Sequence, residues 1–330
     1  MTEPLATLIV VTYNSHRWLT RLRAALDAQT ESRWRLVVVD NASAPDQRPD
    51  AADLPSRAEL LQQEANLGFA AANNLAAHNA TTRYLVLLNP DAFPEPDWLA
   101  QLIATAEQYP QAGAIGSTQI SAHDSTKFDG TGDVMHASGI AYRSGYGKPR
   151  HALRPVAETF SPCGAAMLVR REAFEAVGGF DALYFSYFED VDLGFRLRLA
   201  GWRVLQSPDA VVAHVGGGST GAPSGFAEFH GARNRLWTFF KCMPGALLWL
   251  MLPAHLLGTM LLASVGPFRG RGLHAWRGIS DGFAGLGPIL ATRKLLQSTR
   301  KSTLIDIARA LAWAPDVFFT RRAVHRKIRG

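Results

Sequence analysis

Short continuous apolar runs alternate with amphipathic segments along the first two hundred residues. Residues 7–13 (TLIVVTY) and 34–40 (WRLVVVD) are uninterrupted runs of strand length, typical of strands buried on both faces of a parallel sheet. The segment between them, residues 16–29, places apolar side chains such as Leu22 and Leu26 on one helical face. The pattern therefore predicts a strand, a helix and a second strand.

The same alternation continues after residue 60. Residues 68–80 predict a second helix and residues 83–89 (RYLVLLN) a third strand. Residues 97–109 predict a helix that Pro96 and Asp97 would begin. This βαβαβα order predicts an α/β domain with an open twisted sheet, whose ligand site lies at the carboxyl ends of its strands.

The next segments are less regular. Residues 121–160 are rich in Gly, Ser, His and Asp without clear periodicity, and we expect a long excursion or flap there. Residues 163–171 (CGAAMLVRR) predict another buried strand, followed by a short helix that ends at two glycines. Residues 188–202 fit either a strand or a helix. We interpret them as a helix, because acidic residues open the segment and a glycine follows it.

From about residue 226 the pattern becomes helical. Residues 245–266 (GALLWLMLPAHLLGTMLLASVG) are apolar for about the length that a bilayer crossing needs, although Pro253 and His255 interrupt the run. A crossing, an in-plane membrane helix and a helix buried against protein all fit this pattern, and we favour the two membrane interpretations.

Composition and charge support one large core and a basic tail. The chain is 47% hydrophobic and 19% charged, enough to bury a substantial core. Its net charge of +6 comes from residues 291–330, which hold 10 Lys or Arg against 2 Asp. A basic tail beside an apolar run indicates an anionic membrane surface rather than nucleic acid. We therefore expect an α/β domain over residues 1–240 and a helical, basic, membrane-associating region over 241–330. The sequence indicates no oligomeric state.

Two further absences in the sequence limit the function. The N-terminus has no basic lead before its short apolar run, so we do not read it as a signal peptide and expect the catalytic part on the cytoplasmic side of the membrane. Cys163 and Cys242 are the only cysteines, so neither a disulfide framework nor a structural zinc site is indicated.

Polar residues follow three successive predicted strands. Asn14, Asp40 and Asp91 each stand at or just past a strand end. One such residue is explained by a turn, whereas three in successive units predict a common crevice. Neither GxGxxG after the first strand nor GxxxxGK[ST] occurs. A diphosphate would then have to be held in another way, and Mg²⁺ or Mn²⁺ bridging it to a strand-end carboxylate is the obvious device.

The motifs together resemble a known family. VVTYNS, VVVDNAS, ANLGFAAANN, LLNPDAFPEPDWL, the long segment from CGAAMLVRR to RLAGW, and HVGGGS occur in the order found in family 2 glycosyltransferases, over about residues 5–240. The chain looks most like the rhamnosyltransferase-like branch that acts on bacterial cell-envelope polysaccharides. The resemblance implies a GT-A fold and inverting, metal-dependent transfer to a lipid-linked glycan acceptor. The expected nucleotide-sugar donor is dTDP-rhamnose first, then a UDP-hexose.

The resemblance also implies roles for residues at the strand ends. Asp40 matches the aspartate that contacts the nucleotide base. Asn89 stands where the family carries the first aspartate of its DxD-type motif; it can bond a ribose hydroxyl but adds no charge, which leaves Asp91 as the chief metal carboxylate. The residues expected to bind the nucleotide sugar are Thr12, Tyr13, Asn14, Asp40, Asn41, Asn66, Asn89 and Asp91.

Later motifs supply a second metal ligand and a base. His214 matches a family metal position; a packed histidine or a phosphate contact are its alternatives, and the glycines 216–218 after it would allow close approach to substrate. Asp190 matches the proposed catalytic base, and a helix N-terminus would favour its ionised form. We expect Glu189 and Asp192 mainly to complement the helix dipole, although Glu189 is also a possible acceptor contact.

The roles of two arginines and the function of the whole chain each leave alternatives open. Arg233 and Arg235 could contact the diphosphate or the acceptor's pyrophosphate, or could form a solvated helix face. A sugar-nucleotide nucleotidyltransferase shares the sheet architecture but should carry a glycine- and basic-rich signature near the first strand, which is absent. A non-catalytic membrane-bound partner is the third possibility, which the presence of all three aspartates, Asp40, Asp91 and Asp190, disfavours.

Overall fold

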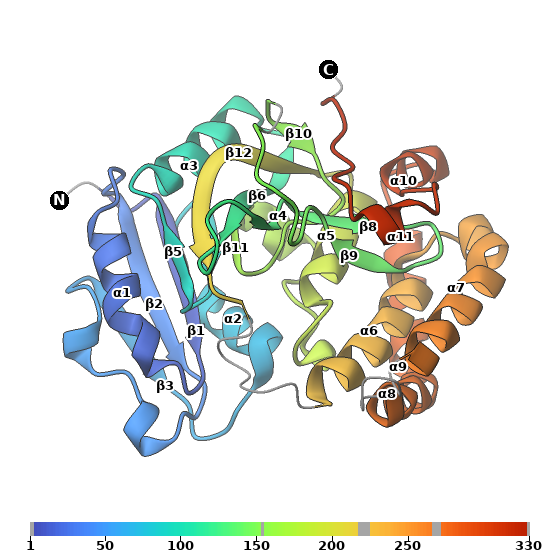
Figure 1. Cartoon of the computed structure of the whole chain (residues 1–330), viewed down its shortest axis with the longest axis horizontal. Coiled ribbons are helices and arrows are strands. Elements are labelled where there is room, and N and C mark those ends of the chain that lie inside the picture. Colours follow the sequence, from blue (N-terminus) through green and yellow to red (C-terminus); the bar gives the residue numbers. More distant parts are fainter. Residues whose placement is uncertain (1–2, 153–154, 217–224, 266–271, 329–330) are drawn as a thin grey trace.

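The computed structural model describes residues 3–152, 155–216, 225–265 and 272–328. A twisted sheet with helices on both faces forms one part of the molecule, and the C-terminal helices pack beside it (Figure 1). The strands are β1 (Ala6–Thr12), β2 (Trp34–Asp40), β3 (Ala58–Gln62), β4 (Tyr84–Leu88), β5 (Ala92–Pro94), β6 (Ala112–Ser121), β7 (Phe128–Gly130), β8 (Asp133–Met135), β9 (Ala141–Arg143), β10 (Ala157–Glu158), β11 (Ala166–Arg170) and β12 (Arg203–His214). The α-helices are α1 (His16–Asp27), α2 (Gly68–His78), α3 (Trp98–Gln108), α4 (Arg171–Ala176), α5 (Glu189–Leu199), α6 (Phe226–Cys242), α7 (Gly245–Val265), α8 (Gly272–Ala284), α9 (Leu286–Ser298), α10 (Leu304–Ala310) and α11 (Val317–Thr320).

The sheet brings the predicted strand ends to one edge. Its order is β10-β12-β6-β11-β4-β1-β2-β3, in which β1 pairs in parallel with both β2 and β4. Thr12 lies opposite Asp40 at the carboxyl end of this parallel part. β11 runs antiparallel beside β4, with Ala166 opposite Leu88. The residues just past β4 and just before β11 are therefore neighbours.

Two apolar layers cover the faces of the sheet. Alternate strand side chains such as Val10 and Val38 pack against α1 and α3, whereas Ile9 and Val37 pack against α2, α4 and α5. Alternation along each strand supplies both layers from one continuous apolar run. This is why the first strands read as unbroken hydrophobic segments, as predicted.

The excursion predicted over residues 121–160 instead contains the short strands β7, β8, β9 and β10. β7 pairs with β6, β8 and β9 form a hairpin, and β10 pairs with β12. Residues 128–139 are buried throughout. Small Gly and Ser side chains allow this close packing, and a segment covered on both sides shows no amphipathic period, so its pattern resembled that of a loop.

The C-terminal helices share a core with the sheet part. Phe195 and Leu199 of α5 pack in the same cluster as Phe239 of α6 and Leu248 of α7. Two backbone hydrogen bonds between Glu158 and Arg326 pair the C-terminal segment with β10. The division into domains at residue 240 stays a prediction, and the two parts are in close contact across it.

Among the described residues, one helix, α7, is long and apolar enough over Gly245–Ser264 to cross a membrane by length and composition. It packs along the protein on one side: His255, Thr259 and Ala263 are buried, spaced four residues apart. Its other side is exposed, with Trp249 at 72% of its surface accessible.

Candidate functional site

The loops after β1 and β2 are joined by hydrogen bonds that fix the predicted nucleotide-binding residues. Asn14, with a left-handed φ of 51°, accepts a hydrogen bond from Ala44 N at 2.8 Å, and its own N donates to Ser43 Oγ at 2.9 Å. Asp40 is 1% exposed and accepts from Ser43 N. The two loops therefore form one rigid border at the end of the sheet.

Asn41 extends this border to the start of α2. Its Nδ2 donates to Asn66 Oδ1 at 2.8 Å, and its Oδ1 accepts from Leu67 N at 2.8 Å. Asn66 Oδ1 in turn accepts from Gly68 N. Thr12 Oγ1 is buried and makes no hydrogen bond among the described residues, whereas the Tyr13 side chain is exposed. The structure brings these predicted residues together; their contact with a nucleotide stays a prediction.

Asp91 and His214 lie side by side, although 123 positions separate them in the sequence. Asp91 follows β4 and His214 ends β12, which pairs with β5 directly after Asp91. His214 Nε2 lies 3.4 Å from Asp91 Oδ1, and both side chains are at least 95% buried. His214 Nε2 makes no hydrogen bond among the described residues.

A second carboxylate orients the imidazole. His214 Nδ1 is hydrogen-bonded to Asp129 Oδ2 at 2.7 Å, and Arg143 Nη1 donates to the same oxygen at 2.7 Å. Burial alone would lower the pKa of His214, but its contacts with Asp129 and Asp91 raise it. Burial alone would raise the pKa of Asp129, but His214 and Arg143 hold it below its ordinary value.

This arrangement fits a divalent cation. In a metal-binding histidine, the ring nitrogen that does not bind the metal usually donates a hydrogen bond to a carboxylate. This bond orients the other ring nitrogen toward the metal. Here Asp129 fulfils that role and Nε2 faces Asp91. The described residues contain no group of three or more His, Cys, Asp or Glu side chains that could hold a metal. Such a cation would therefore take two ligands from the chain and the rest from phosphate oxygens and water.

Asp190 is tied to the same edge of the sheet. Asn89 N donates to Ala165 O at 2.8 Å, and the adjacent Gly164 N donates to Asp190 Oδ2 at 2.8 Å. Asp190 Oδ1 accepts from Val191 N. The predicted base and the predicted DxD-type motif are thus linked through the two residues that precede β11.

Burial opposes the effect that the helix N-terminus was expected to have on Asp190. Its position at the start of α5 was expected to favour the ionised form, yet burial raises its pKa above the ordinary value, against the hydrogen bonds from Gly164 and Val191. Burial, and then the charge of Asp190, raise the pKa of Glu189 well above its ordinary value. Burial therefore favours the neutral form of Glu189 more strongly, while Asp190 is the carboxyl whose anion backbone donors stabilise.

Asp192, Arg233 and Arg235 have fixed partners. Asp192 is fully buried between Arg196 and Lys241, and so does more than complement the helix dipole. Arg233 donates to Tyr184 O and lies 3.4 Å from Asp281, and burial lowers the pKa of Arg235 to about 10. Neither arginine forms a simple solvated face, and their predicted phosphate contacts stay predictions. Of the glycines predicted to approach substrate, 217 and 218 lie outside the described residues.

Comparison with known proteins decides the family. The model of glycosyl transferase family 2 matches residues 7–178, more than half of the chain. The chain belongs to glycosyltransferase family 2. This glycosyltransferase is 33% identical over 249 residues to an N-acetylglucosaminyl-diphospho-decaprenol L-rhamnosyltransferase of Mycobacterium tuberculosis, covering 67% of this chain and 79% of the relative. It is 28% identical to the rhamnosyltransferase WbbL of Escherichia coli K12, covering 61% and 80%.

Solved structures confirm the predicted fold of the glycosyltransferase. A mannosyltransferase from Pyrobaculum calidifontis, solved with GDP-mannose and Mn²⁺, matches 91% of this chain and 86% of its own with a TM-score of 0.53 and 20% identity. GalNAc-T7, solved with UDP, GalNAc and Mn²⁺, matches 73% of this chain but 48% of its own, with a TM-score of 0.58 and 14% identity. These structures confirm the GT-A fold, and the family match with its glycosyltransferase relatives confirms the enzyme class against the nucleotidyltransferase alternative.

Sequence reasoning missed two residues that contact the candidate site. Asp129 and Arg143 lie in the segment that was interpreted as a flap. Asp129 meets His214 across 85 positions. In the sequence, Asp129 is only an isolated carboxylate in a glycine-rich segment. Nothing in this pattern distinguishes it from an aspartate that forms a turn.

Proposed function

We propose that this glycosyltransferase moves L-rhamnose from a nucleotide sugar, dTDP-rhamnose first, to a lipid-linked acceptor that carries N-acetylglucosamine on a diphosphate. The names of its curated relatives support the sugar and the acceptor class. The observation that best supports this chemistry is that the residues lie at one edge of the sheet. Asp91 faces His214 there, and Asp190 is hydrogen-bonded to Gly164 beside the same strand end.

Transfer by direct displacement needs a group on each side of the anomeric carbon. On the acceptor side, Asp190 accepts the proton of the attacking hydroxyl as the new glycosidic bond forms. On the donor side, the bond from the anomeric carbon to the diphosphate breaks, and the anomeric configuration inverts. The border made by Asn14, Asp40 and Asn41 would hold the nucleoside, so that the sugar is presented to Asp190.

We infer that Asp91 and His214 hold Mg²⁺ or Mn²⁺ next to the donor diphosphate. The pair fits such a cation because the carboxylate and the Asp129-bound imidazole are buried and face each other. When bound, the cation supplies charge stabilisation to the departing diphosphate. Asp129 and Arg143 would keep the imidazole in its binding orientation throughout.

Calorimetry tests this assignment. Asp91→Asn should abolish most of the Mn²⁺-dependent binding of dTDP while the circular dichroism spectrum stays unchanged. Asp46→Asn, which alters an exposed carboxylate in the loop after β2, is the matched control and should bind as the wild type does. Equal dTDP affinity with and without Mn²⁺ in all three proteins would refute the assignment of Asp91 and His214 as cation ligands.

We also infer that the enzyme docks on the cytoplasmic face of an anionic membrane, with α7 in the plane of the bilayer. One side of α7 is fixed to the protein, where His255 is stacked on Phe239 and bonded to Ser138 O at 2.8 Å. The opposite side exposes Trp249, Leu250, Leu257 and Leu261. A helix held to the protein along one side and apolar on the other suits an in-plane position.

The charge of the tail is complementary to such a surface. Residues 291–330 hold 10 Lys or Arg against 2 Asp, and each basic side chain near an anionic surface contributes about 1 kcal/mol. The acceptor's lipid would lie in the same bilayer, so docking would place the site beside it.

Vesicle flotation separates the contributions. The wild type should float with vesicles containing anionic lipid, and a Leu250→Ser/Leu257→Ser variant should float less at every salt concentration. Leu75→Ser, which removes an exposed leucine from α2, is the control and should float normally. A wild type that stays at the bottom at low salt would overturn the membrane proposal without affecting the transfer chemistry.

A further inference from the structure

The segment that leads into α5 has an unusual backbone. Phe185, Tyr187 and Phe188 have φ values of 62°, 68° and 69°. Side chains with a Cβ rarely adopt this region, because the Cβ crowds the adjacent carbonyl oxygen. Glu189 and Asp190 follow immediately. The conformation of residues 185–188 therefore decides where the helix starts and where the Asp190 carboxylate lies.

The side-chain amide of Asn234 on α6 contacts most of the carbonyls of this segment, while Arg233 also donates to Tyr184 O and Ala70 N to Phe185 O. Asn234 is fully buried, and the two hydrogens of its Nδ2 are shared among the carbonyl oxygens of Tyr184 at 2.9 Å, Ser186 at 2.9 Å and Tyr187 at 2.7 Å. Its Oδ1 accepts from Arg233 Nε at 3.0 Å, which fixes the orientation of the amide. Three carbonyls of one short segment thus converge on one side chain, as expected where a strained conformation is imposed from outside.

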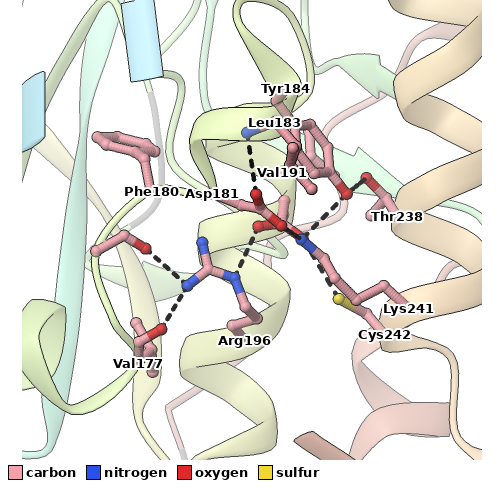
Figure 2. A network of polar contacts seen from close by, with 12 residues as sticks. Val177, Phe180, Asp181, Leu183, Tyr184, Val191, Arg196, Thr238, Lys241 and Cys242 are labelled. Atoms are coloured by element: carbon pink, nitrogen blue, oxygen red, sulfur yellow. Dashed lines mark hydrogen bonds and ion pairs between the residues drawn. The ribbon is translucent and has the colours of Figure 1, made fainter. Parts of the chain in front are cut away.

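Two turns further along α6, a second group of contacts fixes the position of α5. Lys241 Nζ lies 2.7 Å from Asp181 Oδ2 and 2.7 Å from Asp192 Oδ1, and Arg196 Nε lies 2.7 Å from Asp192 Oδ2 (Figure 2). Tyr184 OH bonds to Asp192 at 3.2 Å and to Thr238 at 2.9 Å. These contacts join α5 to α6, so Asn234 and the segment that it holds have a fixed base.

We propose that Asn234 is a positioning residue for transfer: it keeps residues 185–188 in the conformation that presents Asp190 to the acceptor hydroxyl. This inference rests on the proposed role of Asp190 as the base. Without the Asn234 amide, the segment relaxes toward ordinary backbone angles, and Asp190 moves with it. Among the described residues, Asn234 has no bond to the donor border after β1 and β2 or to the Asp91–His214 pair. The segment that it holds reaches that border only through the hydrogen bond from Ala70 N to Phe185 O at 3.2 Å, so we expect the loss to fall mainly on kcat and not on donor binding.

The test is a double-mutant cycle measured with dTDP-rhamnose, Mn²⁺ and N-acetylglucosaminyl-diphospho-polyprenol. Asn234→Ala should lower kcat by about 10²-fold, the cost of a misplacement of order 1 Å, with KM for dTDP-rhamnose within twofold. In an Asp190→Asn background, Asn234→Ala should cost almost nothing more, because the group that it positions is already lost. Losses that multiply in the double variant would show a merely structural role and overturn the inference.

Asn74→Ala is the matched control. Asn74 also grips a loop, since its Nδ2 donates to Phe180 O at 2.8 Å and its Oδ1 accepts from Phe180 N at 2.9 Å, but that loop does not lead directly to Asp190. It should keep its kcat even if its Tm falls. If Asn234→Ala does not fold, Asn234→Ser, which retains one donor, replaces it in the same cycle.

The controls separate the inference from the proposed function. If Asp190→Asn retains turnover, the base assignment fails and the inference fails with it. If Asp190→Asn loses turnover while Asn234→Ala and Asn234→Ser keep theirs, only the positioning role is wrong. Partial recovery of kcat in Asn234→Ala/Tyr187→Gly would add support, because glycine adopts a positive φ without the steric cost.

Discussion

Removing the Asp129 carboxylate should weaken metal binding without touching either proposed ligand. Asp129 Oδ2 accepts from His214 Nδ1 at 2.7 Å, and both side chains are at least 93% buried. Loss of a carboxylate that orients a metal-binding histidine typically lowers metal affinity 10- to 100-fold, about 1.4 to 2.8 kcal/mol. The hydrogen bonds of Asp129 predict which of two substitutions lies near each end of this range of affinity loss.

Asp129→Asn should lie near the tenfold end. Arg143 and His214 both donate to the same oxygen, Oδ2, so an amide oxygen placed there keeps both hydrogen bonds and loses only the charge. Asp129→Ala removes the acceptor as well, frees the imidazole to rotate and leaves Arg143 without this partner. We therefore expect a loss closer to 100-fold for Asp129→Ala.

The assay is calorimetric titration of Mn²⁺ into protein saturated with dTDP. Asp124→Asn is the control, because Asp124 lies in the same segment but is exposed and pairs with Lys127. The result that refutes the reasoning is an unchanged Mn²⁺ affinity in both Asp129 variants while His214→Ala loses binding. Unchanged affinity in His214→Ala as well would show that His214 is not a ligand.

Three further predictions concern the base and the buried ion pairs. Asp190→Asn should lower kcat by roughly 10²- to 10⁴-fold, whereas Glu189→Gln should cost less because burial favours the neutral form of Glu189; steady-state kinetics with the opposite ranking would show that the wrong carboxylate was chosen. Because burial raises the pKa of Asp190, kcat should fall as the pH drops through a value above the roughly 3.9 of a free aspartate, and an acid limb at or below 3.9 would contradict the burial argument. Lys241→Met leaves Arg196 as the one ion-pair partner of Asp192 among the described residues, and should cost about 3 to 5 kcal/mol. At about 2.1 cal/mol/K per residue for 330 residues, this lowers Tm by about 4 to 7 °C. Burial alone would raise the pKa of Asp192, but Arg196 and Lys241 hold it below its ordinary value. The stabilisation by the ion pairs is therefore complete well above about pH 4 and is lost as the pH falls through the lowered native pKa. Calorimetry that shows the same Tm difference between wild type and Lys241→Met at all pH values would contradict the ion-pair account.

The parts of the fold that sequence predicted are those with a strong local pattern. β1, β2, β4 and β11 are apolar on both sides and were found from their unbroken hydrophobic runs. β6 and β12 were missed. Ala112–Ser121 is mostly small residues, and Arg203–His214 is interrupted by a register shift between Gln206 and Val211. Both are buried in the sheet by partners far away in sequence, which no local period reveals.

The same distinction holds for the candidate site. Strand-end residues such as Asp40 and Asp91 could be predicted, because parallel strands end at one edge. The structure also brings His214 to Asp91, and the ligand roles of both stay predictions. Asn234 could not be found in this way, because its importance depends on three carbonyls of a distant segment whose positive φ values have no signature in non-glycine residues.

The most direct measurement of the central claim is the anomeric configuration of the product formed by the full-length enzyme. Wild-type protein is incubated with dTDP-rhamnose, Mn²⁺ and N-acetylglucosaminyl-diphospho-polyprenol, and the product is examined by NMR spectroscopy. The account predicts a rhamnosylated acceptor with inverted anomeric configuration, formed only with a divalent cation and lost in Asp190→Asn. A product with retained configuration, or full turnover by Asp190→Asn, would contradict direct displacement assisted by Asp190.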